Sequence, residues 1–312
     1  MQFKSRPESL LIYIPFSCLL HSIMNKKYPS FQDLQKSINS FKATDLASSS
    51  IISLKDDFLK LITNFAFMPI IIPKLVKMHR IRINDDGKEF DMLNELWCPP
   101  VDVITKLGRC NDVGDQILYM SGGGHTALNE INPKDGDLVT CLECELVENI
   151  TVIDLGASNN LQREAYLQQY SRLNKNAAFI FYKNQNLLKL DKILKNYIIK
   201  EFTQKVDSGQ EYLYKKTVAI SKAFFEAPNI EGIMFPSIKS ELKELNYAIP
   251  ILFANKCLKP TRVDVFRMEY NDRFKKIGFR VLKGCYSNLN FSEPIKYGLP
   301  KPIERWATKQ DI

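Results

Sequence analysis

The chain of 312 residues lacks the glycine-rich signatures of the commonest nucleotide-binding folds. No GxGxxG follows an expected strand and neither GxxxxGKS nor GxxxxGKT occurs, which argues against a Rossmann dinucleotide site and against a P-loop. A GxSxG nucleophile elbow is also missing, so a serine hydrolase of that type is not indicated. The 3 histidines show no HExxH or similar spacing, and a catalytic metal is therefore not expected.

Cysteine pairs and long apolar runs are also scarce. The 7 cysteines have irregular spacing and do not resemble a disulfide framework. The CxxC formed by Cys141 and Cys144 has no second pair to complete a zinc site, so we expect reduced thiols in a cytoplasmic protein. The apolar stretch 10–20 follows two basic residues like a signal peptide but is too short to span a bilayer. We expect a packed helix there, or initiation at Met24 rather than Met1.

The composition is that of an ordinary globular protein, with 45% hydrophobic and 25% charged residues. A net charge of +8 comes from lysines that are scattered along the chain. This balance permits anionic ligands, and a solvated basic surface explains most of it. Nucleic-acid binding through the basic segment 183–200 would predict affinity that falls steeply with salt, but no recognised motif supports it.

Hydrophobic periodicity divides the chain into three parts. Apolar residues recur every three or four positions within 29–75, which predicts helices, and the serines at 48–50 offer an N-cap. We expect an N-terminal helical segment at 1–75, a main domain at 76–285 with a helical insertion at about 161–205, and an extended tail at 286–312. Within the first segment, 70–72 is expected to be an apolar linker between prolines.

The main domain shows short strands and separate helices without a regular βαβ rhythm, which favours an α+β fold. A short helix is expected at Ala127–Glu130, capped by Thr126, and a longer helix at 211–227. Alternating or continuous apolar runs predict strands at 78–83, 116–120, 138–146, 150–155, 232–235, 249–253, 263–268 and 279–282.

A series of short motifs occurs in a fixed order within this domain. It consists of Arg80, Leu96-Trp97-Cys98-Pro99-Pro100, Gly108-Arg109-Cys110-Asn111-Asp112-Val113-Gly114, Leu118-Tyr119, Thr126-Ala127-Leu128-Asn129-Glu130, Val152-Ile153-Asp154-Leu155 and Phe235-Pro236-Ser237. The series resembles the RES-domain family, which is named for an Arg, a Glu and a Ser. The resemblance covers roughly residues 76 to 270.

The resemblance implies a fold, a substrate and a set of site residues. It implies an ADP-ribosyltransferase-like split β core surrounded by helices, and NAD as the substrate. Many members of the family are toxins that a cognate antitoxin restrains, so it also implies a protein partner. Arg80 and Arg109 match the two arginines that the family places around the substrate, although Arg82 is an alternative to Arg80. Tyr119, Glu130 and Ser237 match the aromatic residue, the Glu and the Ser.

The residue types suit the chemistry that the resemblance implies. Arginine offers a planar set of donors that fits the oxygens of a diphosphate. Cleavage of the nicotinamide–ribose bond creates positive charge on the ribose, which the carboxylate of Glu130 would stabilise. Tyr119 would either stack on nicotinamide or pack in the core. Ser237 has no triad partners, so we expect it to donate a hydrogen bond to Glu130 or to substrate and not to act as a nucleophile.

The sequence therefore predicts an NAD-consuming enzyme with Glu130, Arg109 and Ser237 as catalytic candidates. Water, phosphate or a protein side chain could accept the ADP-ribose, which corresponds to a glycohydrolase, a phosphorylase or an ADP-ribosyltransferase. The chain is longer than compact RES toxins because it has extra helices, which leaves room for a partner-binding or effector role. The alternative function is a non-catalytic NAD- or partner-binding protein that retains the fold.

Overall fold

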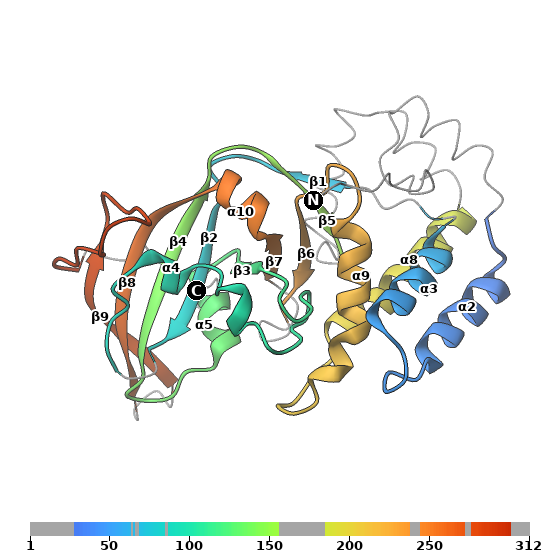
Figure 1. Ribbon diagram of the computed structural model, residues 1–312, viewed down its shortest axis with the longest axis horizontal. Coiled ribbons are helices and arrows are strands. Elements are labelled where there is room, and N and C mark those ends of the chain that lie inside the picture. Colours follow the sequence, from blue (N-terminus) through green and yellow to red (C-terminus); the bar gives the residue numbers. More distant parts are fainter. Residues whose placement is uncertain are drawn as a thin grey trace. The chain divides into compact units, whose positions relative to one another are not determined.

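The computed structural model describes residues 28–63, 65, 69–84, 87–155, 185–237, 244–271 and 276–300. Contacts between Cα atoms divide the chain into two compact units. The first, called the helical unit below, comprises the described parts of Met1–Ile70, Leu107–Asp112 and Ile153–Ile230. The second, the sheet unit, comprises the described parts of Ile71–Lys106, Val113–Val152 and Glu231–Ile312 (Figure 1). Each unit is described separately.

The helical unit contains elements from distant parts of the sequence. These are α2 (Phe31–Ala43), α3 (Ile51–Ile62), α8 (Gln185–Phe202), the 3-10 helix η2 (Glu211–Tyr214) and α9 (Lys215–Phe225). Ser50 caps α3 by accepting a hydrogen bond from the backbone N–H of Ser53 at 3.0 Å, which satisfies one of the free amides at the helix start. The predicted cap among the serines is thus confirmed, and α3 begins directly after it at Ile51.

Aromatic side chains hold these helices together. Phe58 of α3 lies 6.1 Å from Phe41 of α2 and 5.8 Å from Phe224 of α9, measured between ring centroids. Tyr197 of α8 meets Phe41 edge-on at 6.2 Å. Such edge-to-face contacts add to the stabilisation that burial of large apolar surface provides. The helices after residue 185 therefore share one core with the N-terminal helices, whereas the sequence assigned them to the main domain.

Two lysines of α9 bind the end of α2 and the turn that follows it. The Nζ atom of Lys215 donates to the carbonyls of Leu46 and Ser49 at 2.6 and 3.0 Å. The Nζ atom of Lys216 donates to the carbonyl of Lys42 at 2.7 Å. Cations are favourable at the C-terminal end of a helix because the last carbonyls lack partners within the helix. Burial lowers the pKa of Lys216.

The sheet is mixed and mostly antiparallel, in the order β1-β5-β6-β7-β3-β2-β4-β8-β9. β3 pairs with β7 along its whole length, whereas β2 and β3 share a single register pair, His79 with Ser121. Among these central strands, the pairing between β2 and β3 is therefore the shortest, and we call this place the β2–β3 joint. The strands are β1 (Pro69–Ile72), β2 (Lys77–Ile83), β3 (Ile117–Ser121), β4 (Leu138–Leu146), β5 (Ile150–Asp154), β6 (Gly232–Pro236), β7 (Leu245–Pro250), β8 (Leu258–Asn271) and β9 (Lys276–Cys285).

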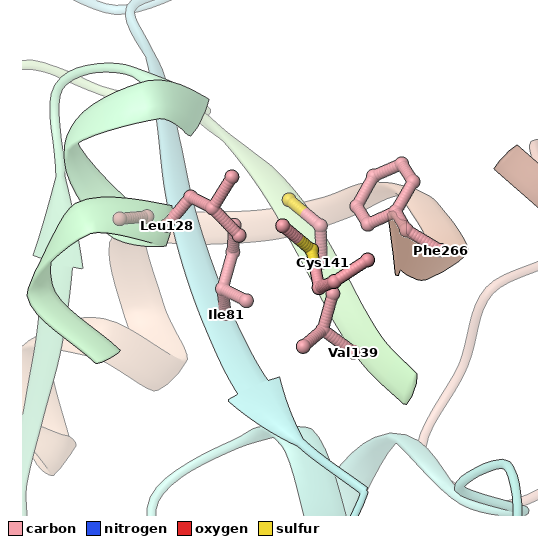
Figure 2. Close-up of a cluster of buried hydrophobic side chains, with 7 residues drawn as sticks. Ile81, Leu128, Val139, Cys141 and Phe266 are labelled. Atoms are coloured by element: carbon pink, nitrogen blue, oxygen red, sulfur yellow. The ribbon is translucent and has the colours of Figure 1, made fainter. Parts of the chain in front are cut away.

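One face of the sheet is covered by α5 (Gly124–Ile131). Ala127 and Leu128 of this helix pack on Ile81 of β2, with Val139 and Cys141 of β4 beside them (Figure 2). Because side chains alternate along a strand, Ile81 and Cys141 mark the face that α5 covers. The other short helices of the described residues are α4 (Leu93–Leu96), the 3-10 helix η1 (Val101–Val103) and α10 (Ile251–Cys257).

The structure corrects three local predictions. Thr126 does not cap α5, because the helix begins at Gly124 and Thr126 is buried within it. Residues 70–72 form part of strand β1 and are not a linker; their β-branched isoleucines suit a strand. The expected strand at 249–253 ends at Pro250, and α10 starts at the next residue, since proline is well tolerated just before a helix.

The mixed fold and most of the other predicted strands are confirmed. The cysteines Cys141 and Cys144 of the CxxC are free and buried, and burial raises the pKa of both thiols. The predictions for 10–20, for 161–184 and for the final residues after 300 lie outside the described residues. Among the residues that the structure describes, no helix combines the length and apolar character needed to cross a bilayer.

Candidate functional site

Glu130 lies in the last turn of α5, and its carboxylate is held by two side chains from the neighbouring strands. Ser237 Oγ donates to Glu130 Oε1 at 2.5 Å, and Asn246 Nδ2 donates to the same oxygen at 2.8 Å. The other oxygen, Oε2, has no hydrogen-bond partner among the described residues. Within the described part of the chain, the carboxylate is thus held through one oxygen only.

Ser237 follows directly after β6, the strand that precedes it in the sequence motif. Its backbone N–H donates to the carbonyl of Glu244 at 2.8 Å, which continues the antiparallel pairing of β6 with β7. The side chain is fully buried. The hydrogen bond to Glu130 is the contact that the sequence predicts for this serine, and the catalytic meaning of the pair stays a prediction.

Asn246 and Ser121 extend this group of polar side chains across the sheet. They are direct partners in the β3–β7 register, and Ser121 Oγ donates to Asn246 Oδ1 at 2.7 Å. Both residues are buried, and a buried polar group is costly unless it is hydrogen-bonded. The side chains of Ser121 and Asn246 are therefore hydrogen-bonded to each other, and Asn246 is also hydrogen-bonded to Glu130. We call Ser121, Glu130, Ser237 and Asn246 the carboxylate network.

Tyr119 lies two residues before Ser121 on β3, so alternation places its side chain on the same face as the carboxylate network. The residue is half-buried. Its backbone carbonyl accepts a hydrogen bond from Arg80 Nη1 at 3.2 Å. The structure therefore places Tyr119 next to the carboxylate network along the strand. Whether its ring stacks on nicotinamide or packs in the core stays a prediction.

Arg80 of β2 carries a charge that no carboxylate balances among the described residues. Its Nε is buried without a hydrogen-bond partner there. Burial lowers the pKa of Arg80 to about 10, and the like charge of Arg82 adds to this effect. The side chain leaves β2 on the face opposite Ile81, yet its guanidinium reaches the carbonyl of Tyr119. The guanidinium thus links β2 to β3 at the joint between these strands.

Arg109 belongs to the helical unit. Its Nη1 donates to the carbonyl of Phe202, the last residue of α8, and both Nη atoms lie 3.4 Å from the carbonyl of Gln204. The guanidinium also lies over the ring of Tyr214, 5.2 Å from its centroid. All these contacts lie within the helical unit. The structure thus brings Glu130 and Ser237 together, with Tyr119 adjacent, and gives Arg109 a place in a different unit.

A second polar cluster lies beside Ser121 on the same face. His79, the register partner of Ser121, has its Nε2 3.4 Å from Glu143 Oε2. Lys77 Nζ lies 3.0 Å from Glu143 Oε1. The hydrogen bond from His79 and then that from Lys77 lower the pKa of Glu143 to about 2. Nδ1 of His79 is buried without a partner among the described residues.

Sequence analysis did not find Asn246, Ser121 or His79. The expected strand began at 249, so Asn246 was outside it, although a lone amide in the otherwise apolar run Leu245–Pro250 could have indicated a buried polar residue. Ser121 precedes three glycines and belongs to none of the motifs. Their meeting depends on the pairing of β3 with β7, which local patterns do not specify.

No group of His, Cys, Asp or Glu within the described ranges has the arrangement of a metal site. No known family model and no curated protein matches the chain. The resemblance to RES domains therefore depends on the motif residues themselves, and the ADP-ribosyltransferase-like arrangement of the fold stays a prediction.

Proposed function

We propose that this protein consumes NAD by cleaving the bond between nicotinamide and ribose. The observation that carries the proposal is the carboxylate of Glu130, which has one oxygen held by Ser237 and Asn246 and the other without a hydrogen-bond partner among the described residues. A carboxylate fixed in this way before substrate binds can stabilise positive charge as it develops, without reorganisation during the reaction. The motif resemblance supplies the identity of the substrate.

The chemistry needs little beyond this carboxylate. The bond between C1′ of the ribose and the pyridinium nitrogen breaks heterolytically, and the electron pair leaves with nicotinamide, which becomes neutral. The ribosyl cation that remains is stabilised by Oε2 of Glu130, as carboxylates do in glycoside cleavage. An acceptor then bonds to C1′ and loses its proton. With water as the acceptor, the products are ADP-ribose, nicotinamide and one proton.

Arg80 supports an anionic substrate. A buried guanidinium without a carboxylate carries an electrostatic cost that a bound phosphate would remove. Among the described residues, Nε of Arg80 has no hydrogen-bond partner, and its Nη1 bonds the carbonyl of Tyr119, so we assign Arg80 to the diphosphate of NAD. Arg109 has no part in the proposed site because carbonyls of the helical unit already bind it.

Release of free nicotinamide from NAD tests this proposal. Purified protein is expected to release nicotinamide, and the Glu130→Ala variant is expected to release far less. Equal release by the two proteins would contradict it. Calorimetry that shows NAD bound but intact over hours would favour the non-catalytic binding function instead. Labelled ADP-ribose on a protein band would identify transfer to a side chain, whereas its absence would leave water or phosphate as the acceptor.

A further inference from the structure

Glu130 occupies a place where the helix itself does not favour a negative charge. It is the residue before the last in α5, which ends at Ile131, and Asn132 follows in a left-handed conformation with φ of 48°. The C-terminal end of a helix carries partial negative charge, which disfavours a carboxylate there. Residue 130 is also exposed, so a glutamate there would ordinarily point into solvent.

The hydrogen bonds of Asn246 determine the orientation of its amide. The amide oxygen carries no proton, so the hydroxyl of Ser121 must donate to Oδ1. The NH₂ group is then directed to Glu130, where a carboxylate can only accept. The opposite orientation would place Oδ1 against a negatively charged oxygen. Ser121 therefore selects the amide orientation that binds Glu130.

Both donors act on the same oxygen of Glu130. Ser237 and Asn246 come from neighbouring strands, β6 and β7, and meet at Oε1. Two donors from different directions fix the plane of a carboxylate, whereas a single donor would leave it free to rotate about the hydrogen bond. The position of Oε2 follows from this restraint. Pre-arranged charges of this kind lower a barrier because the enzyme need not reorganise in the transition state.

We propose that Asn246, oriented by Ser121, is a positioning residue that holds Glu130 with Oε2 directed at the ribosyl cation. This inference rests on the proposed function. Asn246 acts through Glu130 and not on the substrate, so its loss should lower kcat and leave KM nearly unchanged. Ser121 acts one step further away, and its effect should be smaller.

The sharpest variant is Asn246→Asp, which keeps the shape of the side chain but replaces the donor with an acceptor. We expect kcat for nicotinamide release to fall about 30- to 100-fold with KM within about threefold of wild type. Ser121→Ala should lower kcat by about three- to tenfold, and Ser121→Thr, which keeps the hydroxyl, should restore most of it. The matched control is Asn255→Asp, because Asn255 only accepts a hydrogen bond from Trp97 Nε1 and should keep wild-type kcat.

The outcomes separate this inference from the proposed function. If wild type is active and Glu130→Ala is not, wild-type kcat in Asn246→Asp would overturn only the role of Asn246, as would a loss confined to KM. If wild type releases no nicotinamide, the proposed function fails, and NMR of ¹⁵N-labelled asparagine side chains tests the geometry alone. The amide signal that disappears in Asn246→Asp should shift in both Ser121→Ala and Glu130→Ala. An unmoved signal would overturn the inference.

Discussion

The partly buried cations at the helix ends of the helical unit differ from Arg80 of the sheet unit in how their donors are used. In the helical unit, Arg109, Lys215 and Lys216 all bind backbone carbonyls at or after the ends of helices. In the sheet unit, Arg80 bonds one carbonyl and keeps a buried Nε without a partner among the described residues. A cation whose donors are hydrogen-bonded stabilises a fold. A buried cation without a countercharge lowers stability, and it is retained where it serves another purpose. From this comparison we propose a structural role for Arg109 and a ligand-binding role for Arg80.

The same difference separates two exposed glutamates. Glu226 of the helical unit forms an ion pair with Lys55 at 2.6 Å, while Glu130 of the sheet unit has no cationic partner in the described part of the chain. Glu130→Gln should lower kcat for nicotinamide release by about 100- to 1000-fold, the usual effect of removing an electrostatic group from an active site. Steady-state kinetics with Glu226→Gln as the control checks this. A comparable loss in both variants would contradict the distinction between the units.

Arg80→Met should separate binding from stability. We expect the Kd for NAD to rise about 10- to 100-fold, because a charged hydrogen bond to phosphate contributes about 1.5–3 kcal/mol. The free energy of unfolding should stay the same or increase, since an unpaired buried charge is removed. Calorimetry in a Glu130→Gln background, where NAD stays intact, measures the first quantity, and urea denaturation measures the second. Unchanged affinity together with a large loss of stability would make Arg80 structural.

Arg109→Met should show the reverse pattern. Its hydrogen bonds to the carbonyls of Phe202 and Gln204 would be lost, along with its contact with the ring of Tyr214. We expect the free energy of unfolding to decrease by about 1–3 kcal/mol. The Kd for NAD should be unchanged within error. Weaker NAD binding by a fully folded Arg109→Met protein would return this residue to the site.

Substitution of Glu143 should give the smallest change in the free energy of unfolding, and this change should be present only above acidic pH. The pKa of Glu143 is lowered to about 2 by His79 and Lys77, so its ionised form stabilises the fold at pH values above the unfolded pKa. This contribution is lost as the pH falls from about 4.5 to about 2. Glu143→Gln should therefore lower the free energy of unfolding by about 1–2 kcal/mol at pH 7, after allowance for solvent screening. Urea denaturation at pH 7 and pH 3 should show this difference shrinking; a constant difference would contradict the assignment.

Local patterns carried much of the information about the fold. The strands at 78–83 and 138–146 alternate or are continuously apolar, and the structure has β2 and β4 there. The allocation of helices to units could not be derived in this way. The helix α8 joins the N-terminal helices through Tyr197 and Phe41, a contact between residues far apart in sequence, and periodicity reports only that each helix has an apolar face.

The site shows the same division between local and long-range information. Glu130 and Ser237 are recognisable by motif, and in the structure Ser237 Oγ lies 2.5 Å from Glu130 Oε1. Asn246 carries no motif, and its contact with Glu130 follows from strand pairing and the packing of α5. Arg109 matches a motif as well as Arg80 does, but only the structure shows that carbonyls of its own unit already bind its guanidinium.

The structure of the Glu130→Gln variant with intact NAD would test the central claim most directly. The account predicts that the nicotinamide ribose lies against residue 130, on the side away from Ser237 and Asn246, with the diphosphate within hydrogen-bond distance of the Arg80 guanidinium. NAD bound elsewhere, with residue 130 and Arg80 both in their present contacts, would contradict it.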